Sequence, residues 1–383
     1  MYSLLIAPNS FKECINSVDL AKLIENNIKS ISLSDKNISF NTILAPISDG
    51  GDGFLSVCEN YFSLKKYSFS VLAPNKTSII DVFAGIDTVK KICFIESADV
   101  VGIKISPVFI NDPYIFNSYG LGELLFKLNE FNIYNGYLFN KIVIGIGGTC
   151  INDLGLGVGE YFGLKLFDSK NEKLKVQPIN YSKASKIEWK KPNLSFDIEL
   201  VIDIYNELLG KDGAIYCFGK QKGIKNEDLR TFELGFENIL NILEISIKNR
   251  KKLSGAGGGL AAGLFLFFNA KIKTAADFIL KDLEINKINA DVLITGEGCF
   301  DYQSSLNKGA YILINFFNSR INDIFVISGK KDGVVDVKKK DTIIYLEDFF
   351  GSAEESIINI EMGIELACKK IVNKILTKGK NGK

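Results

Sequence analysis

Five polar, glycine-rich segments of this chain carry the lysine, carboxylate, amide and hydroxyl groups that could do chemistry. They are residues 7–12, 48–53, 145–155, 255–259 and 295–304. Glycine lets a backbone approach a ligand closely, and unpaired N–H groups at helix starts attract anions. Lysine adds positive charge, and carboxylates hold Mg²⁺ through oxygen. Phosphoryl transfer needs these components: positioned reactants, neutralised phosphate charge and a carboxylate that orients the attacking hydroxyl.

The segments differ in how strongly their residues indicate a ligand site. Residues 145–155 are the most specific, because glycines, a hydroxyl, an amide and a carboxylate follow one another after an apolar run. Residues 48–53 hold more glycines and carboxylates than a simple turn needs. The others also have ordinary structural explanations, namely a capped turn at residues 7–12, close helix packing at 255–259 and an exposed polar loop at 295–304.

Composition excludes several classes of protein. None of the 383 residues is histidine, which rules out a Ser-His-Asp triad, His-ligated zinc and an imidazole base. The formal net charge of +1 provides no general basic field, so nucleic acid is not an expected partner. The seven cysteines form no C-x-x-C pair and are expected to be reduced thiols in a cytoplasmic protein. No apolar run is long enough to span a bilayer, so no membrane partner is expected.

Familiar nucleotide-binding motifs are missing or incomplete. The chain has no G-x-x-x-x-G-K-[ST] segment. A dinucleotide-binding pattern begins at Gly145 but has Cys150 in place of its third glycine, and a second from Gly255 fails at Leu260. A protein kinase is excluded because the catalytic-loop histidine is absent.

Hydrophobic patterning predicts an α/β protein. A strand at residues 4–7, a helix capped by Ser17 or Asp19 and a strand at 39–45 alternate, which is typical of a mainly parallel sheet. Three short strands between residues 67 and 97 lack intervening helices, which indicates antiparallel pairing and a different domain. Further strands are expected at 141–146, 200–204, 291–294, 324–327 and 337–346. Helices are expected at 117–129 and 352–376, and a glycine-rich turn followed by a helix at 255–268. We expect one discontinuous α/β domain (residues 1–75 and 286–383) and an inserted α/β domain with a mixed sheet (76–285).

Taken in order, the polar segments resemble the motifs of the bacterial type I glycerate kinase family. The matching stretches are residues 7–12, 48–54, 117–124, 145–155, 203–210, 218–223, 254–263 and 295–308. The resemblance implies phosphorylation of D-glycerate, usually at the 2-hydroxyl, with ATP and Mg²⁺ as cofactors. It also implies two α/β domains, one of them flavodoxin-like, with the active site in the cleft between them. A homodimer stays open, as does the domain that binds ATP.

Carried over by position, the resemblance assigns roles to individual residues. The catalytic set is Lys12, Asp49, Asp153 and Lys308. In it the lysines would neutralise anionic charge, and Asp49 or Asp153 would orient or deprotonate the attacking hydroxyl. The metal ligands would be Asp203, Glu297 and Asp301. The substrate- and nucleotide-binding set is Ser10, Gly50, Gly51, Gly147, Gly148, Thr149, Asn152, Asn206, Gln221, Lys222, Gly257, Gly258 and Gln303.

The chain departs from the family pattern at three notable positions. Asn9 stands where the family has Asp, Cys299 where it has Arg, and Asn307 where it has Gly. Replacing Arg removes a bidentate anion clamp that Cys cannot imitate. These departures keep two alternatives open. One is a kinase for another small hydroxyacid or sugar acid, and the other is a non-catalytic protein that binds a nucleotide or metabolite.

Overall fold

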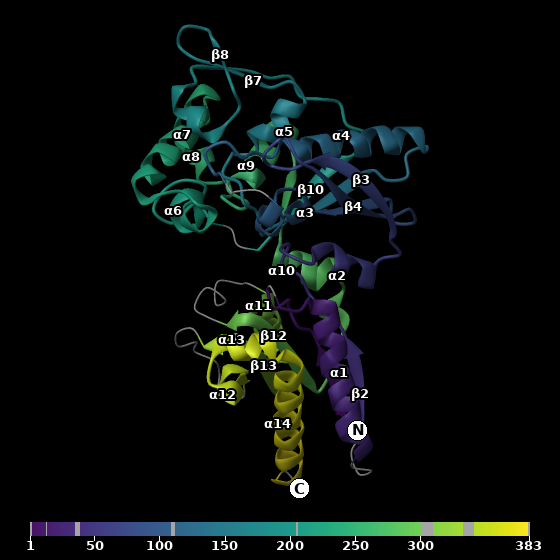
Figure 1. Ribbon diagram of the computed structural model, residues 1–383. Coiled ribbons are helices and arrows are strands. Elements are labelled where there is room, and N and C mark those ends of the chain that lie inside the picture. Colours follow the sequence, from purple (N-terminus) through teal and green to yellow (C-terminus); the bar gives the residue numbers. More distant parts are fainter. Residues whose placement is uncertain are drawn as a thin grey trace. The chain divides into compact units, whose positions relative to one another are not determined.

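The computed structural model describes residues 2–12, 14–34, 39–108, 112–203, 206–300, 309–331 and 341–381. The chain divides into two compact units, each with its own sheet and core. The first unit combines residues 1–61 with 275–383, and the second contains residues 62–274 (Figure 1). The domain limits expected from the sequence, at residues 75 and 286, stay a prediction.

The first unit is built on a parallel sheet with strands in the order β14-β13-β12-β1-β2. Its described strands are β1 (Tyr2–Ile6), β2 (Phe40–Leu44), β12 (Val292–Phe300), β13 (Asp323–Lys331) and β14 (Asp341–Tyr345). Both chain ends contribute, because β1 pairs with β12 in parallel and sets Leu4 opposite Val292. Counted along the chain, this order is the flavodoxin-like 2-1-3-4-5. The predicted α/β class, with a sheet made from both chain ends, is confirmed.

Helices cover this sheet and complete its core. They are α1 (Ser17–Ser34), α2 (Phe54–Tyr61), α10 (Ala275–Asp277), α11 (Gly309–Phe317), α12 (Glu347–Phe350), α13 (Ala353–Ile358) and α14 (Ile360–Asn381). Helices α1 and α14 lie side by side, and Ile24 and Cys368 belong to their shared buried cluster (Figure 1). The predicted cap of α1 is wrong, because Asn16 Oδ1 accepts the hydrogen bond from Asp19 N at 2.9 Å. The predicted terminal helix is two helices, interrupted at Asn359.

The second unit contains a mixed sheet in the order β11-β10-β6-β5-β4-β3. Its strands are β3 (Lys65–Leu72), β4 (Ile79–Asp87), β5 (Ile92–Glu96), β6 (Lys141–Ile146), β10 (Asp197–Ile202) and β11 (Lys271–Thr274). Strands β3, β4 and β5 pair antiparallel, and the remaining pairs are parallel, as the missing helices between residues 67 and 97 predict. A small sheet of β7 (Lys165–Phe167), β8 (Lys173–Leu174) and β9 (Lys186–Glu188) was not expected.

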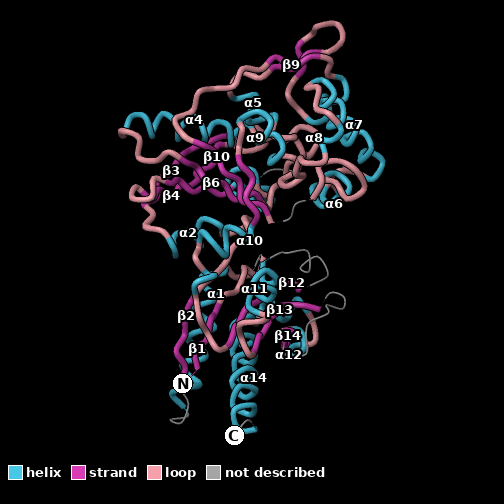
Figure 2. The backbone as a smooth tube through the Cα atoms, turned by 180° about the vertical axis from the view of Figure 1, so that it is seen from behind, coloured by secondary structure: helices cyan, strands magenta, loops and turns pink. Residues whose placement is uncertain are grey.

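Aromatic and aliphatic side chains pack the helices onto this mixed sheet. The helices are α3 (Ser97–Val101), α4 (Tyr119–Tyr134), α5 (Leu156–Tyr161), α6 (Ala214–Phe218), α7 (Leu229–Ile242), α8 (Ile247–Arg250) and α9 (Leu260–Phe268). Helix α4 runs along β3 and β4, where the Phe131 ring lies 4.7 Å from Tyr67 and 5.7 Å from Phe69 (Figure 2). No described helix combines the length and apolarity that crossing a membrane requires.

The polar stretch that begins at Thr295 continues a strand that the sequence analysis expected to end at residue 294. Strand β12 continues to Phe300, with Glu297 opposite Ser328 and Cys299 opposite Lys330 of β13. Glycine makes this possible, because a Cβ on Gly296 would lie 2.3 Å from the carbonyl oxygen of β13 residue 327. Close approach of two backbones selects glycine here without any ligand. Residues 301–308 lie outside the described residues.

Candidate active site

Three of the predicted polar segments meet at one edge of the parallel sheet in the first unit. They follow or end the neighbouring strands β12, β1 and β2, whose carboxyl ends share that edge. Asn9 comes after β1, and its N–H donates to the carbonyl oxygen of Gly296 at 2.8 Å. Its side-chain amide donates to Asp49 Oδ2 at 3.1 Å, and its Oδ1 accepts from Ser10 N at 2.9 Å. Asn9 therefore ties the segment after β1 to the carboxylate that follows β2.

Both carboxylate oxygens of Asp49 accept hydrogen bonds, Oδ2 from Asn9 and Oδ1 from Gly51. The N–H of Gly51 donates to Asp49 Oδ1 at 3.3 Å, and Asp49 is only partly buried. Glu297 is close to Asn9, the residue that contacts Asp49. A Cβ atom on Gly309 would lie 2.6 Å from Asn9 Nδ2 and 3.2 Å from Glu297 Oε2, so both side chains approach the same point. A fixed and partly exposed carboxylate suits a group that accepts a proton or holds Mg²⁺.

Two further predicted residues of this unit, Gly50 and Lys12, lie near the same edge. Gly50 N donates to the Ser48 hydroxyl at 3.2 Å, which closes the turn before α2. Lys12 is exposed, and its backbone passes near Gly298 of β12. The predicted residues Asp301, Gln303 and Lys308 lie outside the described residues.

Asp153 in the second unit is fully buried and acts as a hub for hydrogen bonds. Its Oδ2 accepts from Ser118 N at 2.8 Å, Ser118 Oγ at 2.6 Å and Gly157 N at 3.0 Å. Its Oδ1 accepts from Gly155 N at 3.0 Å. Burial raises the pKa of this carboxyl, and the hydrogen bonds from Ser118, Gly157 and Gly155 oppose the rise. Asp153 thus satisfies backbone donors at the starts of both α4 and α5.

Ser118 is a partner of Asp153 that the sequence-based assignment missed. It lies directly before α4 and has no exposed surface. Its hydroxyl accepts from Val158 N at 3.0 Å while donating to Asp153. A serine immediately before an apolar helical pattern is a cap signal, but nothing in the sequence pairs it with a carboxylate 35 residues later.

Lys222 reaches the segment after β6 from the short helical turn at Lys220–Lys222. Its ammonium donates to Thr149 Oγ1 at 3.0 Å and to the carbonyl oxygen of Ile151 at 2.9 Å. Burial lowers the pKa of Lys222 to about 8, while the nearby Cys150 and Asp153 raise it. The Cys150 thiol is itself buried, which raises its pKa to about 12.

A glycine turn packs against this segment and begins helix α9. Gly257, Gly258 and Gly259 have φ of +67°, +71° and +83°, which side chains strongly disfavour. A Cβ on Gly258 would also lie 2.0 Å from the carbonyl oxygen of Ile151. Gly258 accepts a hydrogen bond from Leu154 N at 3.3 Å, so the turn and the segment after β6 form one packed unit.

Beside this turn, amide atoms of two asparagines are buried without a hydrogen-bond partner among the described residues. The amide nitrogen and oxygen of Asn152 lack a partner within the described part of the chain, and Asn152 has no exposed surface. Asn206 Nδ2 is likewise buried without a partner among the described residues, 2.7 Å from where a Cβ on Gly255 would lie. Because buried polar atoms normally find a partner, these amides indicate a place for a ligand or bound water.

Other predicted residues of the second unit lie near but outside this arrangement. Gly147 and Gly148 follow β6, and Gly148 is exposed with φ of +62°. Gln221 is exposed on the turn that carries Lys222, and Asp203 directly follows β10. Within the described ranges, no three carboxylate or cysteine side chains gather as a metal cluster. This still fits Mg²⁺, which commonly takes one or two carboxylates and completes its shell with phosphate and water.

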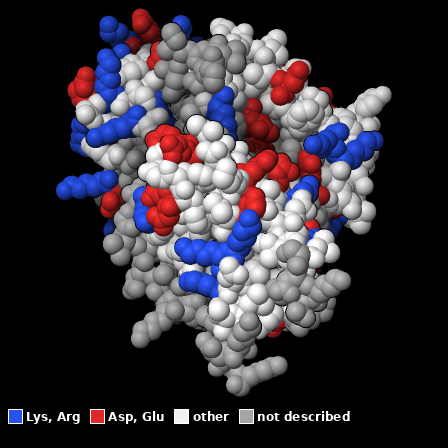
Figure 3. Space-filling view, turned by 60° about the horizontal axis from the view of Figure 1, so that its bottom comes forward, with Lys and Arg blue, Asp and Glu red and all other residues white. Residues whose placement is uncertain are grey.

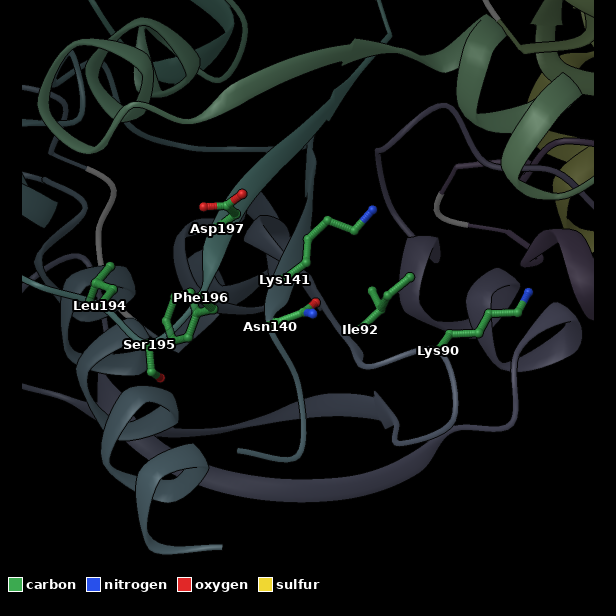
Figure 4. Close-up of a pocket in the computed structure, with 8 residues that line it drawn as sticks. All are labelled: Lys90, Ile92, Asn140, Lys141, Leu194, Ser195, Phe196 and Asp197. Atoms are coloured by element: carbon green, nitrogen blue, oxygen red, sulfur yellow. The ribbon is translucent and has the colours of Figure 1, made fainter. Parts of the chain in front are cut away.

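A hollow of about 610 Å³ lies at the opposite, amino-terminal edge of the mixed sheet (Figure 4). Its lining includes the first residues of β5, β6 and β10, which are Ile92, Lys141 and Asp197. None of the predicted site residues lines it. On the face shown in Figure 3, acidic and basic side chains are interspersed, in keeping with the nearly balanced charge of the chain.

Comparison with known proteins identifies the family. A model of the glycerate kinase family matches residues 4–376. The chain is 30% identical over 313 residues to the glycerate kinase of Neisseria meningitidis serogroup B, with 80% of each chain covered. It is 27% identical over 367 residues to the glycerate 2-kinase of Escherichia coli K12, with 92% of each covered. A Salmonella typhimurium LT2 crystal structure, provisionally assigned as glycerate kinase 2, matches with a TM-score of 0.72 at 23% identity, covering 99% of each chain.

The chain therefore belongs to the glycerate kinase family, and the resemblance seen in its motifs is confirmed. The prediction of an enzyme, a kinase of this family, is confirmed as well. The likeness to the solved structure supports the fold.

We expect Asp153→Asn to unfold far more easily than the parent protein. An amide nitrogen cannot accept from Ser118 or from the glycine N–H groups, so buried donors lose their partner. The free energy of unfolding should fall by about 3 kcal/mol or more, measured by urea denaturation. Asp212→Asn, at an exposed carboxylate, is the control and should change it by about 0.5 kcal/mol or less. Equal stability of the two variants would contradict the hub role of Asp153.

The pH dependence of stability should report the buried Lys222. Because its pKa is lowered from 10.5 to about 8, the unfolded chain binds more protons than the folded chain between those values. The wild type should therefore gain stability relative to Lys222→Met as the pH rises from 7 to 10. Urea denaturation of both proteins at each pH measures this difference, in which other titrating groups cancel. A difference that does not change with pH would show that the ammonium is not desolvated.

Proposed function

We propose that this member of the glycerate kinase family transfers the terminal phosphoryl group of ATP to D-glycerate, giving 2-phosphoglycerate. The observation that carries the proposal is the family match over residues 4–376, together with a fixed carboxylate at the sheet edge where α/β proteins bind ligands. Mg²⁺, when bound, would neutralise charge on the phosphate oxygens. The substrate and nucleotide, rather than nucleic acid or membrane, are the proposed partners.

Asp49 is the better candidate for the group that orients or deprotonates the attacking hydroxyl. Its Oδ2 is aligned by Asn9, its Oδ1 by Gly51, and the side chain keeps access to solvent. Asp153 has no exposed surface, and both of its oxygens already accept hydrogen bonds. We therefore give Asp49 the proton-accepting role and Asp153 a positioning role. A general base within reach of the hydroxyl typically contributes a factor of about 10²–10⁴ to the rate.

The other predicted residues take supporting roles in this proposal. Exposed Lys12, with Lys308, would meet anionic groups of the reactants. The carboxylates that the resemblance assigns to Mg²⁺, Asp203, Glu297 and Asp301, stay the proposed metal ligands. The amide nitrogens of Asn152 and Asn206 would donate to ligand oxygens, because both atoms are buried without a partner among the described residues. All seven cysteines are free thiols, which suits the proposed cytoplasmic location.

The first test is enzymatic turnover with a defined product. Purified protein with Mg-ATP and D-glycerate should release ADP in a coupled assay, and NMR of the product should show the phosphate on the 2-hydroxyl. Comparing kcat/KM across L-glycerate, other small hydroxyacids and sugar acids separates glycerate from the alternative substrates. A higher kcat/KM for another acid would replace glycerate as the substrate, and no turnover with any of them would reject the kinase proposal.

The second test concerns the proton-accepting carboxylate. Asp49→Asn should lower kcat about 10²-fold or more while leaving the protein folded, because the amide keeps the shape but loses basicity. Asp52→Asn, three residues along the same turn, is the matched control and should lower kcat less than tenfold. Circular dichroism checks the fold of both variants. If Asp49→Asn keeps more than a tenth of the wild-type kcat, the assignment of Asp49 fails.

A further inference from the structure

The Lys222 ammonium is almost completely enclosed by protein. The residue is 4% exposed, and its Nζ donates both to the Thr149 hydroxyl and to the Ile151 carbonyl oxygen. Those acceptors are two residues apart in the stretch that follows β6. The ammonium therefore bridges two points of this stretch, and little of its surface is left for direct contact with a ligand.

The same stretch is fastened a second time just beyond Ile151. Asp153 binds the start of α4 through Ser118 and the start of α5 through Gly155. A buried cation thus holds one end of the stretch and a buried carboxylate holds the other. Between them lies Asn152, whose amide has no partner among the described residues and is the part of the stretch best suited to meet a ligand.

Enclosing an ammonium is costly unless hydrogen bonds and nearby charge compensate for the lost hydration. Here the compensation comes from the two oxygen acceptors and from the negative Asp153, while the Cys150 thiol is neutral because burial raises its pKa. A neutral donor could also form hydrogen bonds with a hydroxyl and a carbonyl oxygen. The charge makes both hydrogen bonds stronger and so fixes the backbone more tightly.

We propose that Lys222 is a positioning residue, which holds the backbone of residues 149–151 so that Asn152 is presented to the substrate or nucleotide. This inference rests on the proposed kinase function and deepens it, because the family resemblance implies a binding role for Lys222. If Lys222 instead contacted an anionic ligand directly, Lys222→Met would bind that ligand less well while Thr149→Val would behave normally.

The kinetic test compares Lys222→Met with Thr149→Val, which keeps the shape of threonine but removes the hydroxyl acceptor. Both variants should lower kcat/KM for D-glycerate with Mg-ATP by roughly tenfold or more, and the double variant should be little worse than Lys222→Met alone. Thr149→Ser retains the hydroxyl and should lose less than Thr149→Val. Lys220→Met, at an exposed lysine on the same turn, is the matched control and should behave as wild type. Additive losses, or a raised KM in Lys222→Met with normal Thr149→Val, would overturn the proposal.

A second readout does not depend on turnover. Hydrogen exchange of peptides that cover residues 147–155, in the unliganded full chain, should speed up in Lys222→Met and Thr149→Val but not in Lys220→Met. If Lys222→Met does not fold, Thr149→Val carries the test, since it removes only one hydroxyl. Unchanged exchange in Thr149→Val would overturn the proposal. If the wild type phosphorylates no hydroxyacid, the proposed function fails, yet the exchange result still decides whether Lys222 holds the stretch.

Discussion

The second unit depends on one buried carboxylate, that of Asp153. Removing a charge from water costs several kcal/mol, and the cost is met only if each oxygen finds strong donors. Ser118 and the N–H groups of Gly155 and Gly157 provide them, and in doing so they bring the starts of α4 and α5 together. A Cβ on Gly157 would lie 2.5 Å from Ser118 N, so glycine is needed for this approach. The carboxylate, the serine and the glycine form one interdependent arrangement.

The first unit brings its candidate residues together through the order of its strands. Its candidate residues come from separate parts of the chain, and the parallel order of β2, β1 and β12 brings their carboxyl ends to one edge. Asn9 then aligns Asp49 through a single amide. A second carboxylate at position 9 would place two negative charges in hydrogen-bond contact and raise the pKa of one of them. The neutral amide avoids that repulsion and leaves Asp49 as the acidic partner of the pair.

The sequence allowed the architecture to be predicted because strand and helix periodicities are local signals. The α/β class, the mixed second sheet and the helix after the glycine turn at 255–259 all follow from such patterns. Local patterns could not show that Asp153 is enclosed or that Ser118 is its partner, since those facts depend on contacts across 35 residues. The strand through Glu297 was missed because its glycines and carboxylate are typical of a loop. Its pairing with β13, which makes it a strand, is a contact that no local pattern shows.

Glycine is the residue whose role is hardest to predict from the sequence. A glycine that admits a ligand and a glycine that admits another backbone look the same in a sequence, and both occur here. Gly258 meets the carbonyl of Ile151 and Gly296 meets the backbone of β13, so packing alone explains them. A stronger sign of a ligand site is a buried polar group whose hydrogen bonds the fold leaves unsatisfied. By that measure the Asn152 amide indicates a binding site more directly than the glycines around it, because packing explains the glycines and gives this amide no partner among the described residues.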